Sequence, residues 1–399
     1  MPNELRRGQS ANLALATAAF AITFWAWNLI GPLSGSYSRQ LGLSPTQTSL
    51  LVAIPVLVGS LGRIPVGVLA DRLGGRLMFA IVCFATIVPV LGVGLSDSYG
   101  WLLLWGFLLG VGGTSFAVGI PFVNAWYEPA RRGFATGFFG AGMGGTALSA
   151  FLTPRLVESL GRAQTHVLMA VVLAVMGAVM LLFSRNSPAW TPSTESALPR
   201  IRDAVRIGAT WQCAFLYAVS FGGFVAFSTY LPTLLQIVYG FTQTGAGLRD
   251  AGFSVAAVVA RPVGGVLSDR VGPARVLLIS FAGTAVMAIV LAFTPPPEFF
   301  AGTCFVLMAL FLGLGTGGVF ALVAKLVEPS KVGTVTGLVG AAGGLGGYFP
   351  PLVMGVVYTA THAYTVGYAL LAATALAALA YTWRAFTSSS TTGGGAAGR

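Results

Sequence analysis

The amino-acid sequence predicts an all-α membrane protein with twelve transmembrane helices, arranged as two pseudo-symmetric halves of six helices each. Three observations predict this fold class. Of the 399 residues, 55% are hydrophobic and only 8% are charged, and the mean hydropathy is +0.82. This composition is too apolar for a protein whose surface faces water. Apolar runs long enough to cross a bilayer recur along the chain, and two sequence blocks occur twice at nearly the same separation.

The apolar runs have the length that transmembrane helices require. A helix rises about 1.5 Å per residue, so roughly 20 residues cross a ~30 Å hydrocarbon core. The ten-residue alternation typical of barrel strands is missing from the sequence, which leaves helices to satisfy the backbone in lipid. The twelve expected spans are 11–34, 46–70, 77–96, 101–126, 133–154, 165–184, 210–235, 251–268, 276–295, 299–324, 332–359 and 363–383.

Basic residues outside these spans are distributed unequally between the two sides. An even number of spans puts both termini on one side, and sixteen basic residues fall there: Arg6, Arg7, Arg72, Arg76, Arg131, Arg132, Arg185, Arg200, Arg202, Arg206, Arg270, Arg275, Lys325, Lys331, Arg384 and Arg399. Four fall on the other side: Arg39, Arg155, Arg162 and Arg249. This bias predicts a multi-pass protein of the cell membrane with both termini in the cytoplasm.

The chain divides at its longest polar interval. The interval from Arg185 to Gly208 is rich in proline and serine and carries four arginines, which is typical of a linker. We therefore expect a six-helix half over 1–184, a cytoplasmic linker over 185–209, a second six-helix half over 210–386 and a disordered tail over 387–399.

Two blocks of sequence indicate that the halves arose by duplication. GVLADRLGGR (Gly67 to Arg76) matches GVLSDRVGPAR (Gly265 to Arg275) at an offset of 198 residues. EPARRGFATGFFG (Glu128 to Gly140) matches EPSKVGTVTGLVG (Glu328 to Gly340) at an offset of 200. Two independent matches at nearly one offset predict two related halves with a substrate site between them.

The first of these blocks has the form G-x-x-x-D-R-x-G-x-x-[RK] and resembles the signature loop of the major facilitator superfamily. The aspartates lie at predicted helix ends beside arginines, which can pair with them or with neighbouring helix termini. An ordinary polar loop with topogenic charges is the plainer alternative. We interpret the block as a conformational latch formed by Gly67, Asp71, Arg72, Gly265, Asp269 and Arg270.

Two arginines, Arg63 and Arg261, are the only charged residues within the predicted spans, and no aspartate or glutamate lies in any of them. Each precedes its loop aspartate by eight residues, which places it about 12 Å inside the membrane. A buried guanidinium costs at least a few kcal/mol, and planar forks suit oxyanions. The pair therefore predicts a site for a small anion, with capping by helix carbonyls or snorkelling as the alternative.

Aromatic residues are expected near the same level of the membrane. Phe116 lies in the fourth span, and Tyr217 and Phe221 lie in the seventh. A tyrosine hydroxyl can donate a hydrogen bond to an anion, and phenyl rings can enclose a flat one. Because the chain has 27 phenylalanines, packing alone explains any single ring equally well.

Two glycine-rich segments strongly resemble the signature motifs of the nitrate/nitrite porter family. They run from Gly110 to Gly145 and from Gly313 to Pro351, and TGLVGAAGGLGGYFPP is the most specific stretch. The resemblance implies a major facilitator fold, Arg63 and Arg261 as the anion-binding residues, and Phe116, Tyr217 and Phe221 as pocket residues. The glycines expected to pack neighbouring helices are Gly137, Gly140, Gly337, Gly340 and Gly343. Phe139, Gly144 and Thr316 stand where the family often has asparagine.

These features predict a secondary transporter of nitrate and nitrite that works by alternating access. Arginine keeps its proton, so an empty site would hold two facing positive charges that resist closure, and this favours exchange of one anion for another. A proton-coupled nitrate symporter, an exporter of another small anion or of drugs, and an anion channel or non-transporting sensor remain alternatives.

We expect no enzymatic role and no catalytic residue. His166 is expected near an outer helix end and His362 in an outer loop, each a surface residue with no nucleophile or metal-ligand cluster beside it. Cys83, Cys213 and Cys304 lie singly in apolar runs, without disulfide or metal spacing. The expected partners are the small anion and the lipid bilayer, with no nucleic acid, cofactor or metal, and the expected oligomeric state is a monomer.

Overall fold

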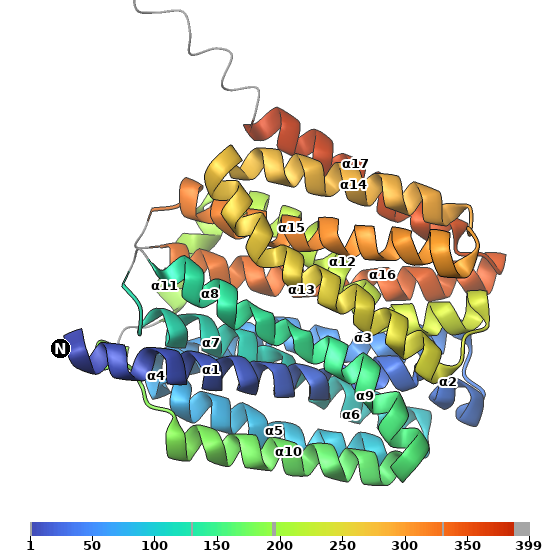
Figure 1. Ribbon diagram of the computed structural model, residues 1–399, viewed down its shortest axis with the longest axis horizontal. Coiled ribbons are helices and arrows are strands. Elements are labelled where there is room, and N and C mark those ends of the chain that lie inside the picture. The colour runs from blue at the N-terminus through green and yellow to red at the C-terminus, as the bar shows by residue number, and fades with distance from the viewer. Residues whose placement is uncertain (1, 129–130, 194–196, 329–330, 387–399) are drawn as a thin grey trace, which may run out of the picture.

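The computed structural model describes residues 2–128, 131–193, 197–328 and 331–386, and every regular element in these ranges is a helix. The helices run roughly parallel to the long axis of the molecule, with the first half of the chain below the second half (Figure 1). Ten helical segments of the described chain are long and apolar enough to cross a membrane, and one bent helix pair is an eleventh. The all-α membrane fold is confirmed. The predicted tail and residues 129, 130, 329 and 330 of the second repeat lie outside the described residues.

Helices of the first half are interrupted where the sequence predicts single spans. Its elements are α1 (Pro2–Trp27), α2 (Ile30–Leu41), α3 (Pro45–Leu61), α4 (Arg63–Leu73), α5 (Gly75–Leu95), α6 (Tyr99–Leu109), the 3-10 turn η1 (Gly110–Thr114), α7 (Ser115–Asn124), α8 (Arg132–Gly140), the 3-10 turn η3 (Ala141–Gly144), α9 (Gly145–Leu160) and α10 (Arg162–Phe183). The helix pair α3 and α4 bends by 40° at Gly62. The expected fifth span, 133–154, is built from α8, η3 and α9.

The second half uses longer, continuous helices. Its elements are α12 (Gly208–Tyr239), α13 (Gln243–Val271), α14 (Pro273–Ala292), the π-helical turn η4 (Pro297–Ala301), α15 (Gly302–Leu326), α16 (Val332–Thr361) and α17 (Thr365–Phe386). The pair α14 and α17 packs on the outside of this half as α5 and α10 pack on the outside of the first (Figure 1). The halves meet where α16 packs against α3, α13 against α9, and α12 against α2.

Two predictions about polar residues are wrong. Helix α13 begins at Gln243, where the Thr242 hydroxyl accepts a hydrogen bond from the backbone N–H of Gly245, so the helix extends beyond the predicted span 251–268 and includes Asp250. Asp250 is fully buried, so a carboxylate does lie within a membrane helix. His166, expected at the surface, is also fully buried on α10, with Nδ1 2.7 Å from the carbonyl oxygen of Arg162. The hydropathy of a sequence does not show where a capped helix begins. It also does not show which polar side chains of a helix are covered by neighbouring helices.

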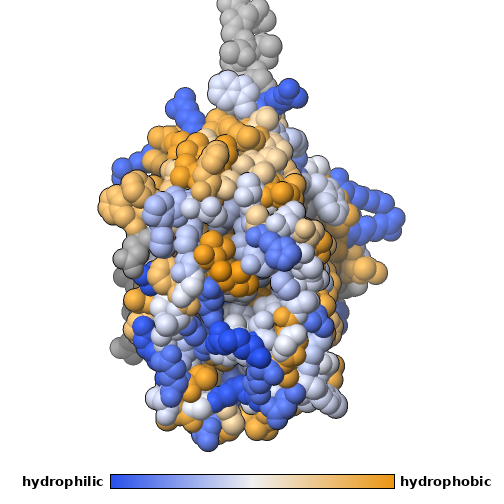
Figure 2. Space-filling view, turned by 90° about the vertical axis from the view of Figure 1, so that its right-hand side faces the viewer, coloured by the Kyte–Doolittle hydropathy of each residue, from blue (hydrophilic) through white to orange (hydrophobic). Residues whose placement is uncertain are grey.

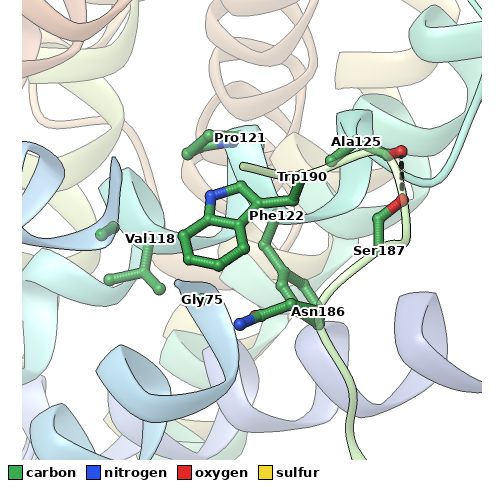
Figure 3. A pocket seen from close by; sticks show the side chains of 9 residues that line it. Gly75, Val118, Pro121, Phe122, Ala125, Asn186, Ser187 and Trp190 are labelled. Atoms are coloured by element: carbon green, nitrogen blue, oxygen red, sulfur yellow. Dashed lines mark hydrogen bonds between the residues drawn. The ribbon is translucent and has the colours of Figure 1, made fainter. Parts of the chain in front are cut away.

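The interval between the halves is folded against both of them. Figure 3 shows Asn186, Ser187 and Trp190 beside Phe122 of α7. The Ser187 hydroxyl donates to the carbonyl of Ala125 at 2.7 Å. The interval also contains a helix, α11 (Ala197–Arg206), which packs against α16 of the second half. The linker thus contacts both halves at the end of the bundle that carries the N-terminus, which we call the terminal end.

The opposite end of the bundle, which we call the far end, is closed by contacts between the halves. Two hydroxyl pairs bridge it, Ser34 to Thr233 at 2.5 Å and Thr46 to Thr359 at 3.0 Å. The Asn28 amide also donates to the carbonyl of Ser228 at 3.3 Å. Figure 2 looks onto this end and shows hydrophilic residues across its lower part, as expected for a surface that faces water.

The halves are less tightly packed toward the terminal end. A Cβ atom added at Gly137 of α8, at Gly265 of α13, or at Gly333 or Gly337 of α16 would meet no heavy atom of the described chain within 4 Å. At the far end, by contrast, a Cβ at Gly247 or Gly355 would overlap an atom of the other half. The structure is therefore closed at the far end and more open at the terminal end.

A cysteine pair at the far end should capture this closure. We expect Thr46→Cys/Thr359→Cys to form a disulfide under mild oxidation, because the two hydroxyl oxygens are 3.0 Å apart across the halves. Mass spectrometry of the digested protein measures the linked peptide. The single variants serve as controls, since the three native cysteines are buried. Free thiols in the double variant after oxidation would contradict a closed far end.

Candidate functional site

The two predicted arginines lie in the interior, one from each half. Arg63 is the first residue of α4, directly after the bend at Gly62, and Arg261 lies within α13. Their exposed fractions are 3% and 7%. The two side chains enter the space between the halves from opposite sides, as equivalent positions in a duplicated fold predict.

Each arginine contacts the glycine-rich segment of the opposite half. Arg63 Nη1 donates to the carbonyl of Gly340 on α16 at 2.7 Å, and its Nε donates to the carbonyl of Gly113 at 3.4 Å. Arg261 Nη1 contacts the sulfur of Met143 in η3, and a Cβ at Gly140 would lie 3.6 Å from Arg261 Nε. Gly140 and Gly340 are equivalent positions of the second repeat, so the two contacts are related by the pseudo-symmetry. These bonds to described carbonyls use two of the five N–H donors of Arg63.

The two guanidinium groups share the same aromatic rings. The Arg63 Cζ atom lies 5.1 Å from the centre of the Phe116 ring and 5.5 Å from that of Phe221. The corresponding distances from the Arg261 Cζ atom are 5.5 Å and 6.0 Å. Rings at this distance attract cations through their quadrupoles, by about 0.5–2 kcal/mol each. The structure therefore brings Phe116 and Phe221 together with both arginines.

Tyr217 completes the group of five predicted residues. Its hydroxyl lies 3.4 Å from Arg261 Nη2, and its ring stacks on Phe221 with 4.9 Å between centroids and 5° between planes. The phenol is fully buried. The site thus combines hydrogen-bond donors, from one hydroxyl and two guanidinium groups, with the apolar faces of two rings. This combination suits a small planar anion.

The five predicted packing glycines fall into two groups. A Cβ at Gly343 would overlap the Tyr217 ring, and one at Gly340 would lie 3.5 Å from the Phe116 ring. Gly140 lies against Arg261, as described above. Gly137 and Gly337 meet nothing within 4 Å. Three of the glycines therefore shape the arginine site itself, and the other two face the open terminal end.

The predicted latch residues do not reach the arginine site. Asp71 Oδ2 lies 3.7 Å from Arg200 Nη2 of the linker helix, instead of pairing with Arg72 beside it. Asp269 and Arg270, the equivalent pair, are exposed and make no ion pair with each other. Half-exposed pairs of this kind contribute about 0–1 kcal/mol. The two copies of this loop are thus asymmetric, because only the first pairs with the helix between the halves.

A glycine in each latch loop has a backbone that other residues rarely adopt. Gly74 and Gly272 have φ angles of 82° and 91°. Each follows the last residue of its helix, and its backbone N–H donates to the carbonyl of the residue four positions earlier. Gly67 and Gly265 have open surroundings, with the nearest atom 3.9 Å from a Cβ at Gly67. The loop therefore requires its second glycine for conformation, and its first glycine is compatible with close approach of a helix in another state.

Metal-ligating residues are not grouped. Within residues 2–128, 131–193, 197–328 and 331–386, three or more of His, Cys, Asp and Glu nowhere come close enough to hold a metal ion. Cys83, Cys213 and Cys304 are buried as free thiols.

The chain was compared with known families and proteins. The family model of the Major Facilitator Superfamily matches residues 16–249 and 239–398. The "Probable nitrate/nitrite transporter NarK2" of Mycobacterium tuberculosis is 56% identical over 380 residues, covering 94% of this chain and 96% of that protein. The "Nitrite extrusion protein" of Bacillus subtilis is 36% identical, with 92% of each chain covered.

The chain belongs to the nitrate/nitrite porter family of the major facilitator superfamily.

A solved structure agrees with this fold at low sequence identity. The crystal structure of a bacterial homologue of the human lysosomal transporter Spinster superposes with a TM-score of 0.71 at 18% identity, covering 94% of this chain and 96% of that one. A relative from Thermus thermophilus, the "Probable nitrate/nitrite antiporter NarK1", is 36% identical and covers 85% of this chain and 83% of its own length. The major facilitator fold predicted from the signature loops is confirmed.

At three positions the sequence resemblance leads us to expect asparagine, and the structure shows the surroundings of the residues present there. Phe139 is buried in a ring cluster, with its ring 6.3 Å from that of Phe116 and 4.7 Å from that of Phe20. Thr316 donates to the carbonyl of Leu312 within its own helix. Gly144 has no neighbour within 4 Å of a Cβ. None of the three presents an amide to the arginines, so the site relies on guanidinium and phenol donors.

Two residues of the site were missed by the sequence analysis. The Phe320 ring of α15 lies 5.6 Å from the Arg261 Cζ atom and 4.7 Å from the Tyr217 ring, tilted against it by 57°, and Met143 contacts the same arginine. Both lie inside the glycine-rich segments that carry the family resemblance. Phe320 follows Thr316 by one helical turn, a spacing that could have marked it as a residue on the same face.

A methyl group at Gly343 should disrupt the site selectively. Gly343→Ala pushes the new Cβ into the Tyr217 ring, which displaces the phenol from Arg261, so we expect anion affinity to fall at least tenfold. Gly337→Ala is the matched control on the same helix, because its Cβ meets open space. Equilibrium binding of labelled anion to purified protein measures both. Equal anion affinities of the two variants would show that Tyr217 does not take part in anion binding.

Proposed function

We propose that this protein is a secondary active transporter that carries nitrate and nitrite across the cell membrane by alternating access. The pair formed by Arg63 and Arg261 carries this proposal, because two cations from opposite halves meet between shared aromatic rings. A bound oxyanion would accept hydrogen bonds from both halves at once and so couple occupancy to their relative position. The named activities of the M. tuberculosis, B. subtilis and T. thermophilus relatives support nitrate and nitrite as substrates.

Exchange of one anion for the other follows from the fixed charge of the site. Arginine side chains are cationic in proteins, and each of these two has less than a tenth of its surface exposed. Without an anion, the two cations repel each other in a region of low dielectric, which opposes the transit of an empty carrier. Nitrite leaving in one direction and nitrate entering in the other would keep the site neutralised during each transit.

Membrane orientation is a separate part of the proposal. We place the terminal end in the cytoplasm, because sixteen of the twenty basic residues outside the predicted spans lie on that side. Asp71 and Asp269 then act at the cytoplasmic ends of α4 and α13 as latch residues that control the change between open states, without contact to the anion. The working unit is one chain, since both arginines and all the rings come from the same polypeptide.

Transport by proteoliposomes tests the function and its coupling together. Vesicles loaded with nitrite, nitrate or no anion are given external labelled nitrate, with and without an inward proton gradient. We expect rapid entry only into the anion-loaded vesicles, because the loaded site returns more easily than the empty one. Rapid entry into anion-free vesicles that depends on the proton gradient would establish symport and exclude exchange. No uptake of either anion in any condition would reject the proposed substrates.

Conservative replacement of either arginine should abolish transport. We expect Arg63→Lys and Arg261→Lys each to lower nitrate uptake by more than tenfold, because an ammonium keeps the charge and loses the planar fork. Arg155→Lys is the control at an arginine outside the site, where the guanidinium stacks on Phe151 at 3.9 Å. Uptake in proteoliposomes and elution in size-exclusion chromatography separate loss of function from misfolding. Normal uptake by either site variant would refute the assignment.

A further inference from the structure

One buried acid lies outside the arginine site and has no partner. Asp250 of α13 has no exposed surface, and neither of its carboxylate oxygens accepts a hydrogen bond from any described residue. Ser254, one turn further along the same helix, is also fully buried, and its hydroxyl likewise has no partner among these residues. Two adjacent unsatisfied polar side chains inside a membrane protein require a physical explanation.

The position of Asp250 links it to the far-end closure. It precedes Arg261 by eleven residues, which is about three helical turns and ~16 Å, so both side chains lie on one face of α13. The neighbouring Gly247 and Ala251 contact the first half, because a Cβ at Gly247 would overlap the carbonyl of Ala150 and Ala251 packs against Ala147 and Ala150. Asp250 is therefore enclosed beside the seam where α13 meets α9.

Charged groups around this seam do not neutralise the carboxyl. Several titratable residues lie at the far end and middle of α13 and of the elements packed against it: Arg155 and Glu158 on α9, Tyr37 and Arg39 on α2, Tyr217, Tyr230 and Tyr239 on α12, Cys304 on α15, and Arg249 and Arg261 on α13 itself. Arg132, Cys213, Asp269, Arg270, Arg275 and Lys325 lie toward the terminal end. Arg155 donates to the carbonyl of Phe151, and Arg249 donates to the carbonyl of Gly245 and stacks on Phe241.

The two protonation states of Asp250 suit different states of the far-end gate, by which we mean the contacts between the halves that close the far end. An unpaired carboxylate ion buried in this seam would cost several kcal/mol, whereas the neutral acid is far less costly to bury. If the far end opens, α13 separates from α9 and the carboxyl becomes hydrated, and a hydrated aspartate ionises above about pH 4. Closing the far end at neutral pH therefore requires one proton.

We propose that Asp250 is a proton-binding site of the far-end gate, so that closing this gate takes up one proton from the far side. The closed state binds one proton more than the open state, so its stability is greatest in acid and falls as the pH rises. The proton remains enclosed while the far end is closed, because the side chain has no exposure to either end. External acidity thereby sets how often the arginine site is open toward the far side, whichever anion it carries.

Distance measurements across the far end test this site without any substrate. Spin labels at Arg39→Cys and Ala360→Cys, two exposed positions on opposite halves, report the open and closed populations by double electron–electron resonance in reconstituted protein. For one linked proton, we expect the ratio of open to closed protein to rise about tenfold per pH unit between about pH 5 and pH 8. Because no anion is present, the result does not depend on the proposed substrates.

Neutral replacement of Asp250 should remove this dependence. We expect Asp250→Asn, and Asp250→Ser as a second variant in case the amide impairs folding, to stay closed with a ratio that is constant over the same pH range. Glu158→Gln is the matched control, an exposed acid at the same end on α9, and should titrate like the unmodified protein. A pH-independent ratio in the unmodified protein, or an unchanged pH dependence in both Asp250 variants, would overturn the proposal.

Discussion

The burial of two like-charged guanidinium groups beside the same two aromatic rings is the constraint on which the rest of the structure depends. Arg63 and Arg261 come from different halves, and each reaches into the glycine-rich segment of the other half. Burying two cations together is unfavourable unless carbonyls, ring faces or an anion compensate the charge. The fold supplies the first two, with the Gly340 carbonyl at 2.7 Å from Arg63 and Phe116 close to both cations. An anion that supplies the third would bind both halves at once.

The glycine-rich segments are what allow these contacts. A residue larger than glycine at position 343 would occupy the space of the Tyr217 ring, and one at position 145 would meet the backbone of α1. Small residues thus bring backbones together where lipid provides no hydrophobic force between helices. The same property leaves other glycines, such as Gly137 and Gly337, in open space at the terminal end. A helix that has some glycines in close contact with its neighbours and others in open surroundings is suited to changing its neighbours during a transport cycle.

Duplication has not made the two halves equivalent. Four spans of the first half are broken by bends or 3-10 turns, while their counterparts α12, α13, α15 and α16 are continuous. The two signature loops show the same asymmetry, because Asp71 pairs with Arg200 of α11 and Asp269 does not pair with Arg270. The buried acid Asp250 also lies only in the second half, since the equivalent stretch before Arg63 reads LVAIPVLVG and carries no charge. Pseudo-symmetry therefore describes the arginine site well and the gates poorly.

The sequence by itself determined the fold class, the duplication, the central arginines and the family, because these depend on hydropathy, spacing and repeated motifs that are local in the chain. It could also place Phe116, Tyr217 and Phe221 at the depth of the arginines, since a helix converts residue number into height. Only the tertiary structure decided which glycines touch the site, that Phe320 and Met143 belong to it, and that Asp250 and His166 are enclosed. Those properties depend on the rotation of each helix and on which neighbour covers it. An apolar segment has the same sequence pattern whether it faces lipid or another helix. The pattern therefore does not show which residues other helices cover.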